Sequence, residues 1–144
     1  MPTDFGSSSD EALDYAVDLA KAIGADIVIM HAYELPIVGF PDGALVATAD
    51  VAARVLEGAQ IGLKKTLDRI EGCGVAVRGV VKQGEPWRAI LDAVDEAGAH
   101  MIVMGTHGRR GLPRALLGSV AEKVVRTATV PVTTIHAREA ARAA

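Results

Sequence analysis

The stretch His100-Met-Ile-Val-Met-Gly-Thr-His-Gly108, followed after nine further residues by Gly118-Ser119, decides the fold of this 144-residue chain. The apolar run up to Met104 is typical of a buried strand, and the residues after Gly118 follow the spacing of an amphipathic helix. Two glycines that come directly after the strand indicate a turn or loop. The sequence therefore predicts a strand, a glycine-rich loop and the start of a helix, in that order.

The composition of this loop makes it a candidate phosphate-binding site. Glycine lets the backbone approach a ligand closely, and a helix N-terminus presents unpaired N–H groups with a partial positive charge. The loop also carries four side chains that can offset phosphate charge, namely His107, Arg109, Arg110 and Arg114. Arg109 is the best placed of these to reach a terminal phosphate as a fork-shaped donor.

A purely structural interpretation of the same loop stays open. Gly105 and Gly108 can serve only to turn the chain, and Ser119-x-x-Glu122 has the pattern of a capping box. In that case the Ser119 side chain bonds the first turn of its own helix. The glycine spacing alone does not choose between anion binding and turn formation.

Strands and helices alternate along the rest of the chain. The predicted segments are a helix from Ser7 to Ile23, a strand over 26–31, a helix over about 49–70, a strand over 75–81, a helix over about 86–97, a strand over 100–104, a helix over 119–128 and a strand over 130–135. Gly79, inside one of the strands, indicates a bulge. Alternation of this kind predicts a parallel α/β sheet, which binds ligands beyond the carboxyl ends of its strands.

Composition and missing motifs exclude several function classes. Aromatic residues make up 3% of the chain and the net charge is −3, so neither stacking platforms nor a general basic field favours nucleic acid as a partner. The chain has no Gly-x-x-x-x-Gly-Lys-Ser/Thr motif of a P-loop NTPase. It also lacks a Gly-x-Gly-x-x-Gly motif after an early strand, which disfavours a dinucleotide-binding fold.

Length, cysteine content and hydropathy describe the class of protein. A length of 144 residues is typical of one domain, so we predict a single domain over residues 1–144, with 137–144 as an Ala/Arg-rich tail. The single cysteine, Cys73, permits no internal disulfide and fits a reducing compartment. We identify no apolar stretch of the roughly 18 residues that a membrane span needs, so we expect a cytoplasmic protein with no membrane partner.

The glycine pattern and its flanks resemble a known family. Gly105-x2-Gly108-x9-Gly118-Ser119, with Val130-Pro-Val132 after the helix, resembles the ATP-binding signature of the universal stress protein family. Pro2-Thr-Asp4, Met30-His-Ala32 and Gly84-x-Pro86 resemble further segments of that family in the same order. The resemblance implies a five-stranded parallel sheet of strand order 3-2-1-4-5 with helices on both faces.

The same resemblance implies a nucleotide site. Its residues would be Pro2, Thr3, Asp4, Ala32, Met104, Gly105, Gly108, Gly118, Ser119 and Val120, joined by Arg109 from the loop. The first four would hold the adenosine end and the others the ribose and phosphates. Mg²⁺ or Mn²⁺ is expected on the phosphates, because such ions prefer oxygen ligands, although the sequence shows no metal-ligand cluster. For Asp4 an Asx-turn is the alternative role, and for His31 we expect a structural hydrogen bond.

The chain departs from the family pattern at two strands of the sheet, the central one and the last one. Only Met1 precedes Pro2, so the strand expected at the centre of the sheet is apparently truncated, and we expect residues to be missing before Met1. Its absence would leave apolar surface and backbone groups unpaired on the neighbouring strands. Thr133-Thr134 stands where the family has aliphatic residues, so the edge Val130–Ile135, through which we expect a homodimer, would be more polar.

Three functions follow from these observations. The first is a stress-response regulator that binds ATP, with AMP or cyclic AMP as alternatives, and acts as a homodimer. Hydrolysis would be slow at most, because no general base or P-loop lysine is evident. The second is a protein-interaction module of the same fold that needs no nucleotide. The third, an enzyme transferring adenylate or sulfur, would need a catalytic cysteine in the cleft, and Cys73 lies at a predicted helix end.

Overall fold

The computed structural model of the chain describes residues 1–36, 49–106 and 117–136. Helices and strands alternate as the sequence predicts. In chain order they are α1 (Ser7–Ile23), β1 (Ile27–Tyr33), α2 (Ala49–Arg69), β2 (Val77–Gln83), α3 (Pro86–Ala97), β3 (Ile102–Gly105), α4 (Ser119–Thr127) and β4 (Val132–Ile135). The strand boundaries differ from the predicted ones by one to two residues, and the last strand is shorter than 130–135.

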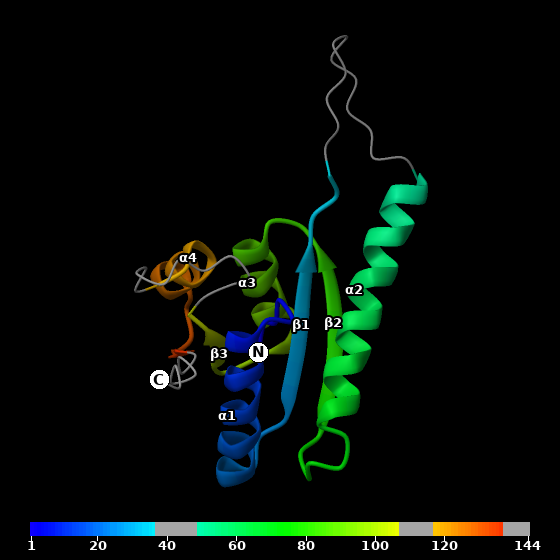
Figure 1. The fold of residues 1–144 in the computed structure, drawn as a ribbon. Helices are drawn as coiled ribbons and strands as arrows, with labels where there is room; N and C mark the ends of the chain where they lie inside the picture. Colours follow the sequence, from blue (N-terminus) through cyan, green and yellow to red (C-terminus); the bar gives the residue numbers. More distant parts are fainter. Residues whose placement is uncertain (37–48, 107–116, 137–144) are drawn as a thin grey trace, which may run out of the picture.

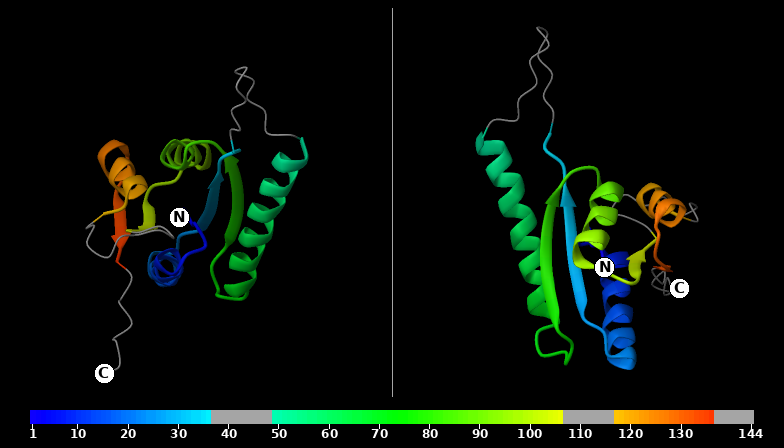
Figure 2. Two further views of the ribbon diagram at one scale, coloured as in Figure 1. Left: turned by 45° about the horizontal axis from the view of Figure 1, so that its top comes forward. Right: turned by 180° about the vertical axis from the view of Figure 1, so that it is seen from behind.

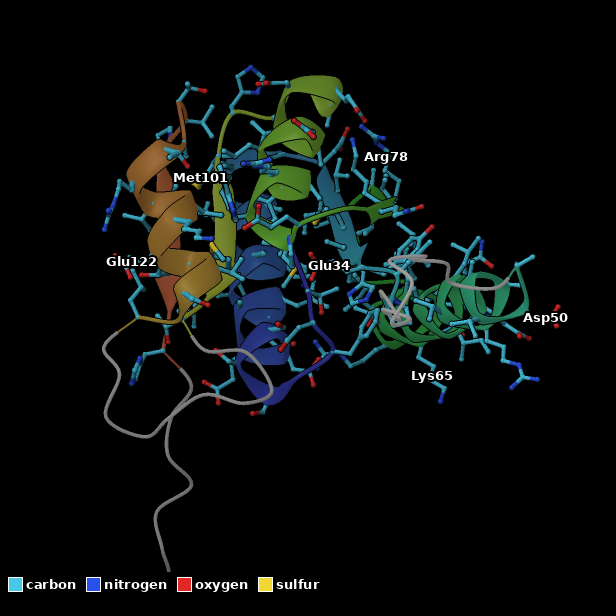
Figure 3. The ribbon with its side chains drawn as sticks, turned by 90° about the horizontal axis from the view of Figure 1, so that it is seen from above. Glu34, Asp50, Lys65, Arg78, Met101 and Glu122 are labelled. Carbon is cyan, nitrogen blue, oxygen red and sulfur yellow. The ribbon has the colours of Figure 1, made fainter. Side chains whose placement is uncertain are left out.

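The four strands lie in one layer between two layers of helices (Figures 1 and 2). β1 pairs in parallel with β2, and β3 pairs in parallel with β4. α1 and α2 cover one face, whereas α3 and α4 cover the other. Viewed from above, α2 with Asp50 and Lys65 lies at the opposite side of the molecule from α4 with Glu122 (Figure 3). The α/β class with helices on both faces is thus confirmed.

The predicted strand order 3-2-1-4-5 is not confirmed. Among the described residues, the structure contains two separate two-stranded sheets, and no strand joins β1 to β3. The chain start lies between them and forms a single parallel bridge, Pro2 to Met30. The Met30 N–H donates to Met1 O and the Thr3 N–H donates to Met30 O, both at 2.9 Å. Residues 1–3 therefore lie along β1 without forming a strand.

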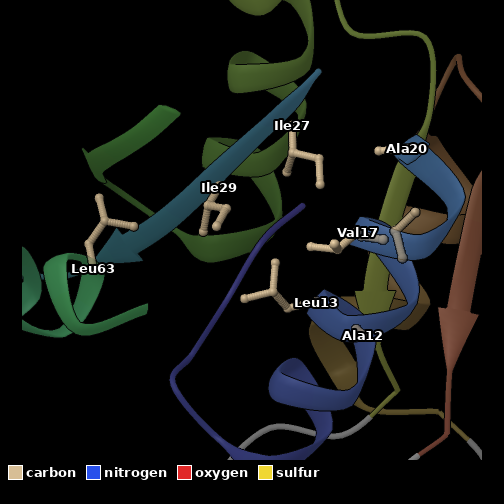
Figure 4. Close-up of a cluster of buried hydrophobic side chains, with 9 residues drawn as sticks. Ala12, Leu13, Val17, Ala20, Ile27, Ile29 and Leu63 are labelled. Atoms are coloured by element: carbon tan, nitrogen blue, oxygen red, sulfur yellow. The ribbon is translucent and has the colours of Figure 1, made fainter. Parts of the chain in front are cut away.

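The hydrophobic core has one cluster on each face of the strand layer. Leu13, Val17 and Ala20 on one side of α1 face Ile27 and Ile29 of β1, and Leu63 of α2 completes this cluster (Figure 4). The second cluster includes Met30, Ile90, Ile102 and Val124 under α3 and α4. Ile29 and Met30 point to opposite faces because side chains alternate along a strand. β1 is apolar on both faces, as a strand buried between two helix layers must be.

Gly79 forms no bulge, so that prediction is wrong. The register between β1 and β2 runs unbroken from Ile27 opposite Val77 to Tyr33 opposite Gln83. A Cβ atom at position 79 would lie 2.9 Å from side-chain atoms of both Leu63 and Leu67 of α2. The glycine is therefore required by the close approach of α2 to the sheet rather than by backbone conformation.

Replacing this glycine should loosen the packing of α2. We expect Gly79→Ala to lower the free energy of unfolding by about 1–3 kcal/mol, because the added methyl displaces two leucines in a packed layer. Urea denaturation with an unchanged m-value measures the effect. Gly58→Ala, in α2, is the matched control, since a Cβ there meets nothing within 4 Å. It should be neutral or stabilise by up to about 1 kcal/mol; equal destabilisation by both substitutions would contradict the packing argument.

None of the helices within the described ranges combines the length and the apolarity needed to cross a bilayer.

Candidate functional site

A cavity of about 210 Å³ lies where β1 and β3 reach their carboxyl ends. Its walls come from the chain start, from the ends of these two strands, and from the N-termini of α3 and α4. The lining residues are Pro2, Thr3, Asp4, Ser9, Met30, His31, Ala32, Pro86, Ile90, Met104, Gly105, Thr106, Gly118, Ser119, Val120 and Ala121. The cavity is thus at the edge of the sheet where parallel α/β proteins place their ligands.

Nine of the eleven residues predicted for the site line this one cavity. They are Pro2, Thr3, Asp4, Ala32, Met104, Gly105, Gly118, Ser119 and Val120. The other two, Gly108 and Arg109, lie outside the described residues, as do the remaining basic residues of the loop. Segments more than 100 positions apart in the chain meet here because the carboxyl ends of parallel strands share one edge.

The start of α4 differs from the predicted capping box. Gly118 is the N-cap, and no side chain caps the helix. Ser119 is exposed at the first helical position, and Glu122 pairs with Arg126 instead. The interpretation of Ser119 as a capping residue is therefore wrong.

The backbone amides at this helix start are not all available. The Gly118 N–H donates to Thr106 O at 2.6 Å, so this amide closes the loop on β3 and cannot bind a ligand. The first bond of the helix runs from Glu122 N–H to Gly118 O at 2.8 Å. Ser119, Val120 and Ala121 form the first turn of this helix, where N–H groups have no acceptor within the helix itself. These three residues line the cavity, where the helix end adds a partial positive charge.

Asp4 forms the Asx-turn that we gave as its alternative role. Its Oδ1 accepts the Gly6 N–H at 3.0 Å and the Ser9 hydroxyl at 2.5 Å, and the Asp4 N–H donates to Ser9 Oγ at 3.3 Å. These bonds hold the carboxylate in the wall of the cavity. Asp4 is therefore oriented by its own loop, and the Asx-turn does not remove it from the site.

His31 makes the structural hydrogen bond predicted for it and also lines the cavity. Its Nδ1 lies 2.8 Å from Thr3 O, and because a carbonyl only accepts, Nδ1 carries the hydrogen. In the neutral ring Nε2 is then an acceptor. The ring packs on Phe5, with 4.2 Å between centroids. Phe5 has a φ of 62°, a strained conformation for a non-glycine residue next to the site.

Sequence reasoning missed seven lining residues. They are Ser9, Met30, His31, Pro86, Ile90, Thr106 and Ala121. Met30 and Ile90 are also core residues. Apolar periodicity identifies a core side chain but does not show whether that side chain also borders a cavity. Pro86 carried a usable signal, because a proline at a predicted helix start after a strand marks the carboxyl edge of the sheet.

An ion pair joins the two helices that flank the cavity. Lys123 Nζ of α4 donates to Glu85 Oε1, before α3, at 2.9 Å. This hydrogen bond is the main reason that the pKa of the Glu85 carboxyl lies below its usual value. Over the part of the chain that the structure describes, no three His, Cys, Asp or Glu side chains gather as a metal site.

Comparison with known proteins gives a consistent result. The model of the universal stress protein family matches residues 1–136. Universal stress protein MJ0531 of Methanocaldococcus jannaschii is 35% identical over 134 residues, which cover 92% of this chain and 77% of that protein. The solved structure of MJ0577, from the same organism, has a TM-score of 0.80 at 21% identity and covers 96% of this chain and 94% of its own. A universal stress protein solved in complex with cAMP has a TM-score of 0.66 at 28% identity, with coverage of 96% and 94%.

Proposed function

We propose that this chain, because it belongs to the universal stress protein family, binds an adenine nucleotide in the cavity between β1, β3 and the start of α4. One observation carries the proposal: the cavity joins an apolar wall to a helix N-terminus. Ala32, Met30 and Ile90 form a surface suited to a planar base, and the N–H groups at the start of α4 suit phosphate. The relative solved with cAMP supports the same ligand class.

The lining residues divide into two proposed groups. Pro2, Thr3, Asp4 and Ala32 would hold the adenosine end, with the Asp4 carboxylate accepting hydrogen bonds from ribose or base. Met104, Gly105, Gly118, Ser119 and Val120 would surround the ribose and phosphates, with Gly108 and Arg109 completing the set. Because the Gly118 N–H is already bonded to Thr106 O, Gly118 would contribute shape, and the amides of the next three residues would contribute charge.

A divalent ion would enter this site with the nucleotide. Mg²⁺ or Mn²⁺ takes phosphate oxygens and water as ligands and needs only one or two protein oxygens. Among the described residues that line the cavity, Asp4 is the acidic one, and its carboxylate already accepts two hydrogen bonds. We therefore assign the ion to the phosphates, with neutralisation of their charge as its role.

The site supports binding better than fast hydrolysis. Among the described lining residues, the titratable side chains are Asp4 and His31, and both are engaged in hydrogen bonds to their own chain. Neither is positioned by these bonds to activate a water at a terminal phosphate, so transition-state stabilisation would be small. This is the behaviour of a sensor, and we infer a role as a stress-response regulator.

The regulator would act as a homodimer through the segment Val130–Ile135. Among the described strands, β4 has β3 as its partner on one edge, which leaves the other edge for a second copy. Thr133 and Thr134 are good strand formers and are half-buried in the single chain. The alternative function, an interaction module without nucleotide, would keep this dimer and lose the ligand.

Calorimetric titration with ATP, AMP and cAMP in the presence of Mg²⁺ tests the proposal. Binding should release heat and raise the melting temperature progressively with the logarithm of ligand concentration, because the ligand stabilises only the folded state. Mass spectrometry of the denatured purified protein would detect nucleotide that is already bound. Absence of heat and of a melting shift at millimolar ligand would contradict nucleotide binding and favour the interaction module.

A charge placed at Ser119 should separate phosphate binding from other effects. We expect Ser119→Glu to weaken ATP binding about tenfold, since two charges 4 Å apart repel by roughly 1 kcal/mol in water and 4 kcal/mol near a protein surface. AMP should lose less than ATP, because it carries less charge. Ser119→Gln is the matched control of equal size, and it should change affinity less than threefold. Because Ser119 is exposed and acidic residues suit a helix start, both variants should melt like the parent. Equal affinities for the two variants would place the phosphates elsewhere.

A further inference from the structure

Phe5 has a φ of 62°, and no other non-glycine residue in the described ranges has a positive φ. A side chain in this left-handed region costs about 1–3 kcal/mol, so the conformation persists only where surrounding contacts fix it. One of these contacts is a hydrogen bond from the Phe5 N–H to Thr3 Oγ1, at 3.0 Å. The Phe5 ring also lies between two other elements, against His31 of β1 and against Gly62 of α2.

The contact with β1 connects Phe5 to the wall of the cavity proposed for the nucleotide, which we call the nucleotide cavity. The Phe5 ring stacks on His31, with 4.2 Å between the ring centroids and 30° between the ring planes. His31 donates to Thr3 O at 2.8 Å, and both residues line the nucleotide cavity. Asp4, directly before Phe5 in the chain, lies in the same wall. Phe5 thus contacts this wall at two segments without lining the cavity itself.

The contact with α2 depends on a glycine. A Cβ atom at position 62 would lie 2.5, 2.8 and 2.9 Å from Cε2, Cζ and Cδ2 of Phe5. These distances are far below the about 3.5–4.0 Å at which carbon atoms make favourable contact. The missing side chain of Gly62 therefore provides the space that the ring occupies. Gly58, one turn earlier in the same helix, differs in this respect, because a Cβ atom there meets nothing within 4 Å.

The same ring borders a surface cavity of about 410 Å³ between α2 and the start of α1. The lining of this outer cavity includes Phe5, Ile61, Gly62, Lys65 and Arg69. Ile61 is 49% exposed, and Lys65 is labelled in Figure 3 on the exposed side of α2. Phe5 is therefore part of the wall of the outer cavity and also contacts the wall of the nucleotide cavity.

We propose that Phe5 is a positioning residue through which the position of α2 sets the affinity of the nucleotide cavity. This inference rests on the proposed nucleotide binding. The ring is seated against Gly62, and its contact with His31 and its bond to Thr3 hold the cavity wall. A movement of α2 would move the ring and, with it, the groups around the ligand. Because coupling between two sites is reciprocal, bound nucleotide would also favour one position of α2. The outer face of α2 is then the surface at which a regulator would report its ligand.

Gly62→Ala tests this coupling with a methyl group outside the nucleotide cavity. Its Cβ atom must displace the Phe5 ring, so we expect the affinity for ATP with Mg²⁺ to fall about tenfold. Gly58→Ala adds the same methyl group one turn earlier and should leave the affinity unchanged. Calorimetry at a temperature where all variants are folded excludes an effect of stability alone, because affinity then refers to the folded protein. Equal affinities of the two variants would overturn the proposal.

Phe5→Ala removes the ring and keeps the Cβ atom. We expect it to weaken ATP binding about tenfold as well, because the cavity wall loses its support. In this background Gly62→Ala should change the affinity less than about twofold, since no ring remains for the methyl group to displace. A tenfold loss from Gly62→Ala both with and without the ring would show that α2 acts on the site by another route, and would overturn the role of Phe5.

A measurement without ligand separates this proposal from nucleotide binding itself. The aromatic ring of Phe5 shifts the proton NMR signals of the His31 ring, which are identified by their loss in His31→Gln. Gly62→Ala should move these signals toward their positions in Phe5→Ala, and Gly58→Ala should leave them in place. Unchanged signals in Gly62→Ala would overturn the proposal, whether or not the parent binds ATP. If the signals moved as expected but the parent bound no nucleotide, the proposed function would fail and the link from α2 to the cavity wall would stand.

Discussion

Gly105→Ala is expected to lower the free energy of unfolding by about 3 kcal/mol, the largest loss of stability that we predict from one methyl group. A Cβ at this position would lie 2.5 Å from Ser8 Oγ and 2.8 Å from the carbonyl carbon and oxygen of Ser8. The last two atoms belong to the backbone of the first turn of α1, which cannot rotate away as a side chain can. β3 would have to move away from α1, and the cavity would lose its shape.

Urea denaturation measures the loss of stability, and the ATP titration described above measures the effect on the site. Ser8→Ala is the companion substitution, because the Ser8 hydroxyl is buried without a hydrogen-bond partner among the described residues and its removal should be close to neutral. The double variant should recover only part of the loss, since the backbone contact remains. An unchanged denaturation midpoint for Gly105→Ala would show that β3 and α1 are less tightly packed than the structure indicates.

Ala32→Trp is expected to weaken nucleotide binding by at least about 100-fold, or 2.7 kcal/mol. Ala32 lies near the carboxyl end of β1 in the wall of a cavity of about 210 Å³, and an indole there would occupy the space proposed for the adenine ring. The substitution adds apolar surface at a half-buried position next to an existing cavity, so the fold should tolerate it.

Calorimetry with ATP and cAMP measures this loss, and both ligands should be affected equally because they share the base. Ala22→Trp is the matched control: the same substitution at an exposed position of α1, outside the cavity, should leave affinity unchanged. If Ala32→Trp bound nucleotide as the parent does, the base would lie outside this cavity. Together with Ser119→Glu, the two substitutions test the two ends of the proposed ligand separately.

The two ends of the strand layer differ in the segments that surround them. At the carboxyl ends, the Asp4 turn, β3 and the start of α4 surround the proposed nucleotide. At the amino ends, β1 and β3 border a second cavity, which also contacts Met1. Residues 1–3 separate the two cavities, and they bond directly to Val28 and Met30 of β1.

Element types could be predicted from residue patterns, and most of the site from the resemblance of the glycine pattern and its flanks to the universal stress protein family. The run His100–Met104, the glycines after it and the helical spacing beyond Gly118 are local features, because each depends on neighbours within a few positions. The alternation of helices and strands, which predicted a parallel α/β sheet, is likewise read from the sequence. Nine predicted site residues line one cavity because the carboxyl ends of parallel strands meet at one edge.

Other features depend on which distant segments come into contact. The Gly118 amide bonds to Thr106 O, Asp4 accepts the Gly6 N–H in an Asx-turn and the Ser9 hydroxyl beside it, and Gly79 lies under two leucines of α2. From the sequence, we predicted a phosphate contact for Gly118 and a bulge at Gly79. For Asp4 the choice between a ligand contact and an Asx-turn stayed open. Each of these three contacts depends on a partner that packing brings close. The local sequence around a residue does not identify that partner. The gap between β1 and β3 is likewise a tertiary feature: unpaired strand edges exist only once two strands are held apart in one layer.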